Sequence, residues 1–132
     1  MNTKILMGGS AVFMAGIGLA MTFMPQEISY WAWNMQTLGI TLILQILGAL
    51  YFGFAMTNWM AKGSLIGGIF GKPLALGNLA HFSIAGIAAI RSINPLNGSP
   101  IAWAVALAYL VFAMAFGVIA FGGRLSSIQP KN

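Results

Sequence analysis

The stretch from Ile101 to Phe121, IAWAVALAYLVFAMAFGVIAF, decides the fold class of this chain. It contains no charged residue, and it is long enough to cross the hydrocarbon core of a bilayer, which takes about 20 residues. Within the bilayer each backbone N–H and C=O group must be paired internally, and a single segment achieves this only as an α-helix. The stretch therefore predicts a transmembrane helix at 101–121.

Three more apolar runs precede this one and predict three more transmembrane helices. They cover 5–24, 38–60 and 74–90. Proline, glycine and asparagine gather between the runs, as is typical of turns. The short connection at 94–100 predicts that the third and fourth helices are antiparallel neighbours. The expected fold is all-α: one domain, 1–132, forming an integral membrane four-helix bundle with short connections.

The composition supports a membrane protein and excludes several kinds of chemistry. The chain has 132 residues, of which 59% are hydrophobic and 5% are charged, whereas soluble domains are about 25% charged. Its six basic residues are scattered and form no patch with aromatic residues, so we expect no nucleic-acid partner. The lack of cysteine excludes disulfides and thiolate chemistry. A single acidic residue cannot provide a catalytic carboxylate pair.

The distribution of charge predicts an orientation. With four spans, the N-terminus, the connection at 61–73 and the C-terminal tail share one side of the membrane. Basic residues are concentrated on the cytoplasmic side of membrane proteins, so we expect both termini in the cytoplasm, in a bacterial inner (plasma) membrane. The lysines of 61–73 could also meet lipid phosphates. The basic residues on this side are Lys4, Lys62, Lys72, Arg124 and Lys131, whereas Glu27 and Arg91 lie on the other side.

The segment 25–37 predicts a short interfacial helix that begins near Pro25, a residue favoured in the first turn of a helix. Ile28, Trp31 and Met35 would face the membrane surface.

Glu27 and Arg91 fall on the same side and could form an ion pair, unless Arg91 extends to the lipid headgroups instead. Tryptophan is enriched at the membrane boundary, and the predicted interface anchors are Trp31, Trp33, Trp59 and Trp103.

Polar residues within the spans are the candidate ligand site, because such residues are unfavourable in hydrocarbon. Asn78 and His81 lie one turn apart in the third run, and Asn58 occupies a similar depth in the second. These three side chains could converge, with Gln45 reaching groups deeper in the membrane. The alternative is that they form hydrogen bonds that hold the helices together.

We expect no metal and no cofactor. One histidine and no cysteine cannot provide the three or four protein ligands of a zinc site. A haem held by His81 would need a methionine or a second copy of the chain for its other ligand, and the nine methionines are better explained as packing residues. Pairs of small residues allow close helix packing, and also self-association, in every run. They are Ala11 with Ala15, Gly16 with Ala20, Ala49 with Gly53, Ala85 with Ala89, Ala104 with Ala108, and Ala113 with Gly117.

The size and four-span layout are similar to those of dual-topology multidrug exporters and fluoride channels. The embedded glutamate in the first helix of those exporters is missing here, and the charge bias is strong where dual topology goes with a weak one. No family motif is found in the chain, so no residue role is transferred.

Three classes of function remain. The first is a membrane protein that acts by binding, as an accessory or scaffold subunit or as a binder of lipid or another apolar ligand. The second is an oligomeric small transporter or channel with a polar lining around His81, and the third is a lipid-modifying enzyme with His81 as base. The first is favoured because reactive groups are scarce. The expected partners are membrane lipid and either further copies of the chain or a larger membrane complex.

Overall fold

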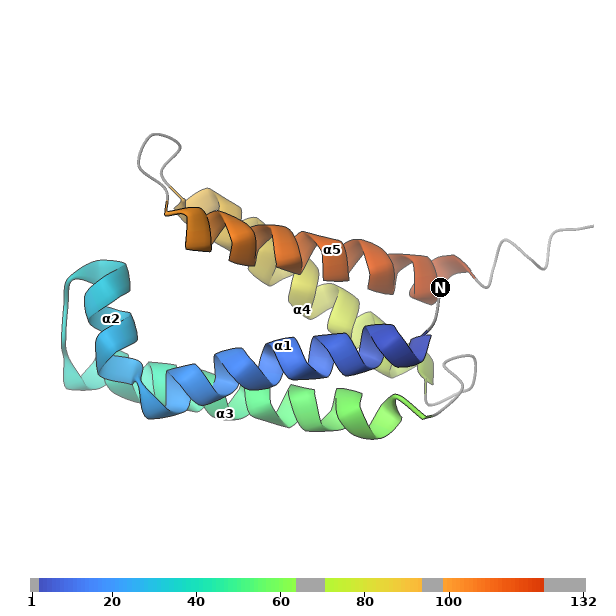
Figure 1. The fold of residues 1–132 in the computed structure, drawn as a ribbon, viewed down its shortest axis with the longest axis horizontal. Coiled ribbons are helices and arrows are strands. Elements are labelled where there is room, and N and C mark those ends of the chain that lie inside the picture. The colour runs from blue at the N-terminus through green and yellow to red at the C-terminus, as the bar shows by residue number, and fades with distance from the viewer. Residues whose placement is uncertain (1–2, 64–70, 94–98, 123–132) are drawn as a thin grey trace, which may run out of the picture. The chain divides into compact units, whose positions relative to one another are not determined.

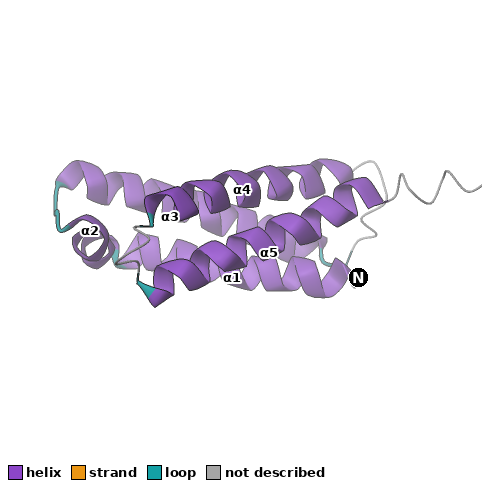
Figure 2. Ribbon diagram, turned by 90° about the horizontal axis from the view of Figure 1, so that it is seen from above, coloured by secondary structure: helices purple, strands orange, loops and turns teal. Residues whose placement is uncertain are grey.

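The computed structural model describes residues 3–63, 71–93 and 99–122, and helices make up 92% of them, with no strand among them (Figures 1 and 2). This confirms the predicted all-α class. Four of the helices are long and apolar enough to cross a membrane. The helices are α1 (Thr3–Phe23), α2 (Pro25–Trp33), α3 (Leu38–Ala61), α4 (Gly71–Ser92) and α5 (Pro100–Gly122).

Contacts group the helices into two compact units. The first, Met1–Gly63, contains α1, α2 and α3, and the second, Ser64–Asn132, contains α4 and α5. The connection predicted at 61–73 and the turn at 94–100 lie largely outside the described residues, as do Arg124 and Lys131.

In the first unit, α1 and α3 pack side by side in opposite directions (Figure 1). Ser10 meets Asn58 near one end of the pair, and Gly18 meets Gly48 toward the other. A Cβ atom on Gly18 would lie 2.9 Å from the backbone oxygen of Gly48, so the two backbones touch directly at this point. The buried residues of α3 are spaced by four, seven and three residues, which places them on one face of the helix: Leu44, Gly48, Ala55 and Asn58.

α2 confirms a helix after Pro25, which stands in its first turn. The helix is shorter than the predicted 25–37, because Asn34 takes a left-handed conformation (φ 52°) and ends it after Trp33. Met35 therefore lies outside the helix. Thr37 then caps α3, its hydroxyl accepting a hydrogen bond from the backbone N–H of Ile40 at 3.3 Å.

In the second unit, α4 and α5 are antiparallel neighbours, as the short connection predicts. Their contact is largely aromatic: Phe82 stacks on Phe112 and Phe116 at centroid distances of 4.9 and 5.7 Å, and meets Tyr109 at 5.6 Å. Gly86 lets the helices approach, since a Cβ there would lie 3.2 Å from Cβ of Tyr109. Such ring pairs add about 0.5–1.5 kcal/mol beyond their buried area.

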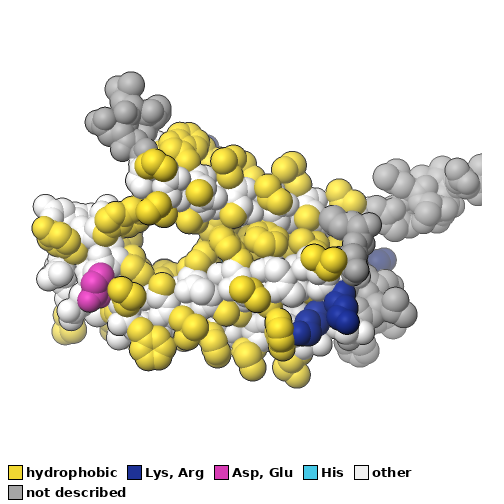
Figure 3. All heavy atoms as spheres, viewed as in Figure 1, with side chains coloured by type: hydrophobic (Ala, Val, Ile, Leu, Met, Phe, Trp, Pro, Cys, Tyr) yellow, Lys and Arg dark blue, Asp and Glu magenta, His cyan; other side chains and the backbone are white. Residues whose placement is uncertain are grey.

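Large apolar side chains cover the outer faces of the helices (Figure 3). On α5, for example, Leu107, Val111, Met114 and Val118 are each more than half exposed. Water-soluble monomers rarely expose apolar patches beyond a few hundred Å². Together with four helices of spanning length, these surfaces indicate an integral membrane protein.

Candidate functional site

The polar residues predicted to form one site fall in both units. Asn58 is fully buried in the first unit, where its amide Nδ2 donates to the Ser10 hydroxyl at 3.1 Å and lies 3.7 Å from Sδ of Met14. Ser10 in turn donates to the backbone oxygen of Met7 at 3.0 Å. A continuous chain of hydrogen bonds thus runs from α3 into α1.

Asn78 and His81 lie one turn apart on α4, in the second unit. Asn78 is fully buried, and its amide donates to the backbone oxygen of Leu74 at 2.9 Å. The His81 ring meets the edge of Phe82 at 5.3 Å and lies 6.0 Å from the Tyr109 ring. His81 is therefore part of the aromatic contact between α4 and α5. The predicted convergence of Asn58 with this pair stays a prediction, because it joins the two units.

Gln45 differs from these three residues because it is exposed. It follows Leu44, which is buried against the rest of the first unit, and so points off the packed stripe of α3. Its side chain makes no hydrogen bond to any other described residue. It does not join Asn58 in the interior of the first unit.

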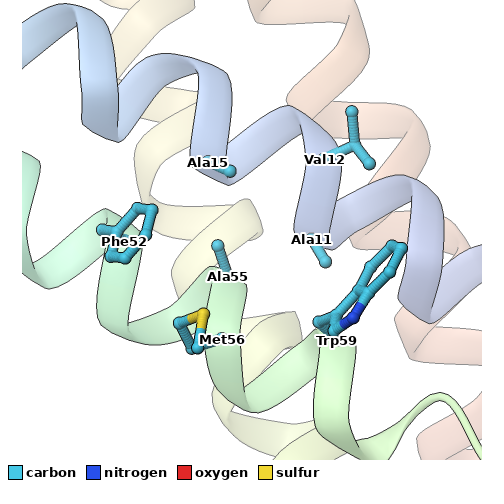
Figure 4. Close-up of a pocket in the computed structure, with 7 residues that line it drawn as sticks. All are labelled: Ala11, Val12, Ala15, Phe52, Ala55, Met56 and Trp59. Carbon is cyan, nitrogen blue, oxygen red and sulfur yellow. The ribbon is translucent and has the colours of Figure 1, made fainter.

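An apolar groove on the first unit was not predicted from the sequence. It lies between α1 and α3, has a volume of about 260 Å³, and has no charged residue in its lining (Figure 4). Phe52 and Trp59 stand at its two ends on α3, as Figure 4 shows, and small side chains on α1 leave the space between them. The lining residues are Ala11, Val12, Ala15, Phe52, Ala55, Met56 and Trp59.

The predicted interface anchors are all at least partly exposed. Trp31 and Trp33 lie on α2 with 63% and 56% of their surface exposed, and Trp103 lies in the first turn of α5. Trp59 differs from the other three because its indole also lines the groove. Their positions relative to a bilayer stay a prediction.

Glu27 and Arg91 lie at favourable ends of their own helices. Glu27 is in the first turn of α2 and Arg91 is in the last turn of α4. A negative charge near a helix N-terminus and a positive charge near a C-terminus are each stabilised by the helix dipole. The ion pair between them would join the two units, and it stays a prediction.

The residues that sequence reasoning missed are of two kinds. Ser10 could have been recognised in the sequence as a hydroxyl inside an apolar run. Its bond to Asn58 could be identified only from the register of α1 against α3. Nothing in the sequence distinguishes the groove residues Val12, Phe52 and Met56 from the apolar residues around them. In an almost wholly apolar helix, residues facing a groove and residues facing lipid have the same character.

Comparison of the chain with models of known protein families, with curated proteins and with solved structures gives no match.

Proposed function

We propose that this protein acts in the membrane by binding, and that the apolar groove between α1 and α3 holds a hydrocarbon chain such as a lipid acyl chain. The observation that carries the proposal is the lining of the groove: seven side chains without a charge, opened by alanines opposite aromatic rings. Ligand pockets are mostly apolar and concave, and an extended groove along two helices suits a flexible chain.

The setting of the polar residues supports binding over transport or catalysis. Asn58 and Asn78 are buried and donate hydrogen bonds inside their own units, to Ser10 and to the Leu74 backbone. His81 packs among aromatic rings. These are the contacts expected of side chains that hold helices together.

The charge bias supports an orientation with both termini in the cytoplasm of a bacterial inner membrane. We also infer that the protein works beside other membrane components, as a homo-oligomer or as a subunit of a larger complex. The exposed apolar faces of α3 and α5 offer surface for such contacts.

Filling the groove tests the proposal. Val12 lines the groove and is 64% exposed, so Val12→Trp would occupy the space without disturbing buried residues. Val118 on α5 is 63% exposed and lies outside the groove, which makes Val118→Trp the matched control. The measurement is intact-mass spectrometry in mild detergent after purification from native membranes, which reports retained lipid.

We expect the unmodified protein and Val118→Trp to retain lipid equally, and Val12→Trp to retain at least tenfold less. Ala15→Leu, a smaller change in the same groove, should give an intermediate loss. Equal retention by all four proteins would show that the groove is not a binding site.

A further inference from the structure

The end of the groove nearest Trp59 is also the cationic end of the first unit. Ser10 on α1 is bonded to Asn58 on α3, so the two helices run past each other in a known register. Lys4 lies six residues before Ser10 and Lys62 four residues after Asn58, which brings both lysines to the same end of the helix pair. Figure 3 shows basic side chains gathered where α1 begins and α3 ends.

Both lysines lie on the groove side of their helices. The Lys62 ammonium lies over the ring of Trp59, 2.8 Å from its centroid, and that ring lines the groove. Lys4 precedes Ala11, another lining residue, by seven residues, which is about two helical turns and places it on a similar face. The charge therefore lies on the line of the groove, just beyond its end.

We propose that the groove and these two lysines together form a site for an anionic phospholipid, with the acyl chain along the groove and the phosphate-bearing headgroup at Lys4 and Lys62. The inference rests on the proposed function, since it names the ligand of the same groove. Charge complementarity selects the headgroup: the part of the first unit that the structure describes carries two basic side chains, and both stand at this end.

The opposite end of the first unit has the opposite character. Glu27, the single acidic residue of the chain, lies on α2, which follows the far end of α1. A lipid whose chain occupies the groove can therefore meet favourable charge only if its headgroup is at the lysine end. A free phosphate would use the lysines but leave the groove empty, so the pairing of the two features indicates a lipid.

The shape of Trp59 suits the boundary between chain and headgroup. Its side chain lines the apolar groove, and the Lys62 ammonium lies over its ring. A tryptophan has an apolar body and a polar N–H, and such residues favour the depth where acyl chains meet headgroups. The Lys62 side chain is thus held at the depth where a lipid phosphate would lie.

Competitive lipid binding tests the proposal. The full-length protein is reconstituted in nanodiscs holding equal amounts of phosphatidylglycerol and phosphatidylcholine with identical acyl chains, and the lipids that stay bound on extraction are measured by native mass spectrometry. We expect the unmodified protein to favour phosphatidylglycerol. Each lysine near an anionic leaflet contributes about a fivefold preference.

Three variants separate the contributions. Lys4→Gln and Lys62→Gln should each reduce the preference about fivefold, whereas Lys62→Arg, which keeps the charge, should restore it. Lys72→Gln is the matched control, since Lys72 is an exposed lysine at the start of α4 in the other unit. It should leave the preference unchanged.

The outcomes distinguish failure of this inference from failure of the proposed function. If the protein retains both lipids equally, and Val12→Trp removes both, the groove binds chains but the lysines select no headgroup. If Lys72→Gln reduces the preference as much as Lys62→Gln does, the effect belongs to the membrane surface and not to this site. If Val12→Trp removes neither lipid, the proposed function fails as well.

Discussion

Asn58 links the two long helices of the first unit through its side chain. An amide buried in an apolar environment is unfavourable unless it is hydrogen-bonded, and the Ser10 hydroxyl supplies the partner. Because Ser10 is itself bonded to the Met7 backbone, its oxygen is held in position to accept. The pair therefore sets the register of α1 against α3, and with it the residues that line the groove.

Removing either member of this pair should weaken the first unit. We expect the coupling energy between Asn58→Ala and Ser10→Ala in a double-mutant cycle to be about 0.6 kcal/mol, the average for such bonds in membrane proteins. Unfolding in mixed micelles with increasing SDS measures it. In the control cycle Thr57→Ala takes the place of Asn58→Ala, because the exposed Thr57 hydroxyl donates its hydrogen bond within α3, to the backbone oxygen of Phe54. A coupling near zero for Asn58 and Ser10 would contradict the role of the pair in setting the register.

At the scale of the element, the contact between α1 and α3 depends on two glycines. Any side chain on Gly48 would press on the α1 backbone, because a Cβ there would lie 2.8 Å from the oxygen of Gly18 and 2.9 Å from the nitrogen of Thr22. The Thr22 hydroxyl donates to the Gly18 oxygen at 2.8 Å and packs against the same point. Both helices therefore lack a side chain where their backbones meet.

Gly48→Ala should destabilise the first unit by about 1–3 kcal/mol, since overpacking forces the helices apart. Gly53 is the matched control in the same helix, because a Cβ there would meet nothing within 4 Å. Gly53→Ala should be neutral or stabilise by up to about 1 kcal/mol through higher helix propensity. Thermal unfolding in detergent compares the two. If both variants lose the same stability, the close approach at Gly48 is not what holds the pair together.

At the scale of the whole molecule, we expect the charge bias to set the orientation of the chain in the membrane. A reporter that is active only in the cytoplasm, fused after Lys131, should be active, and one fused within 94–98 should be inactive. Replacing Lys4, Lys62 and Lys72 together by glutamine should produce molecules of both orientations. A single retained orientation in that variant would mean that features other than these lysines set the topology.

The sequence by itself determined the membrane class, the four long helices and the helix after Pro25. These follow from local properties: the length of an apolar run, the lack of charge within it, and the effect of proline on the backbone. It also identified Asn58, Asn78, His81 and Gln45 as candidate polar residues within the spans, but not which of them contact one another.

The tertiary structure alone decided which residues meet. The Ser10–Asn58 bond, the contact of Gly18 with Gly48 and the groove between Phe52 and Trp59 all depend on the register and rotation of one helix against another. In a helix exposed to lipid, hydrophobic periodicity does not separate the inner face from the outer one, because both are apolar. The packing of α1 on α3 determines which faces are buried. The same packing places Lys4 and Lys62 beside one end of the groove.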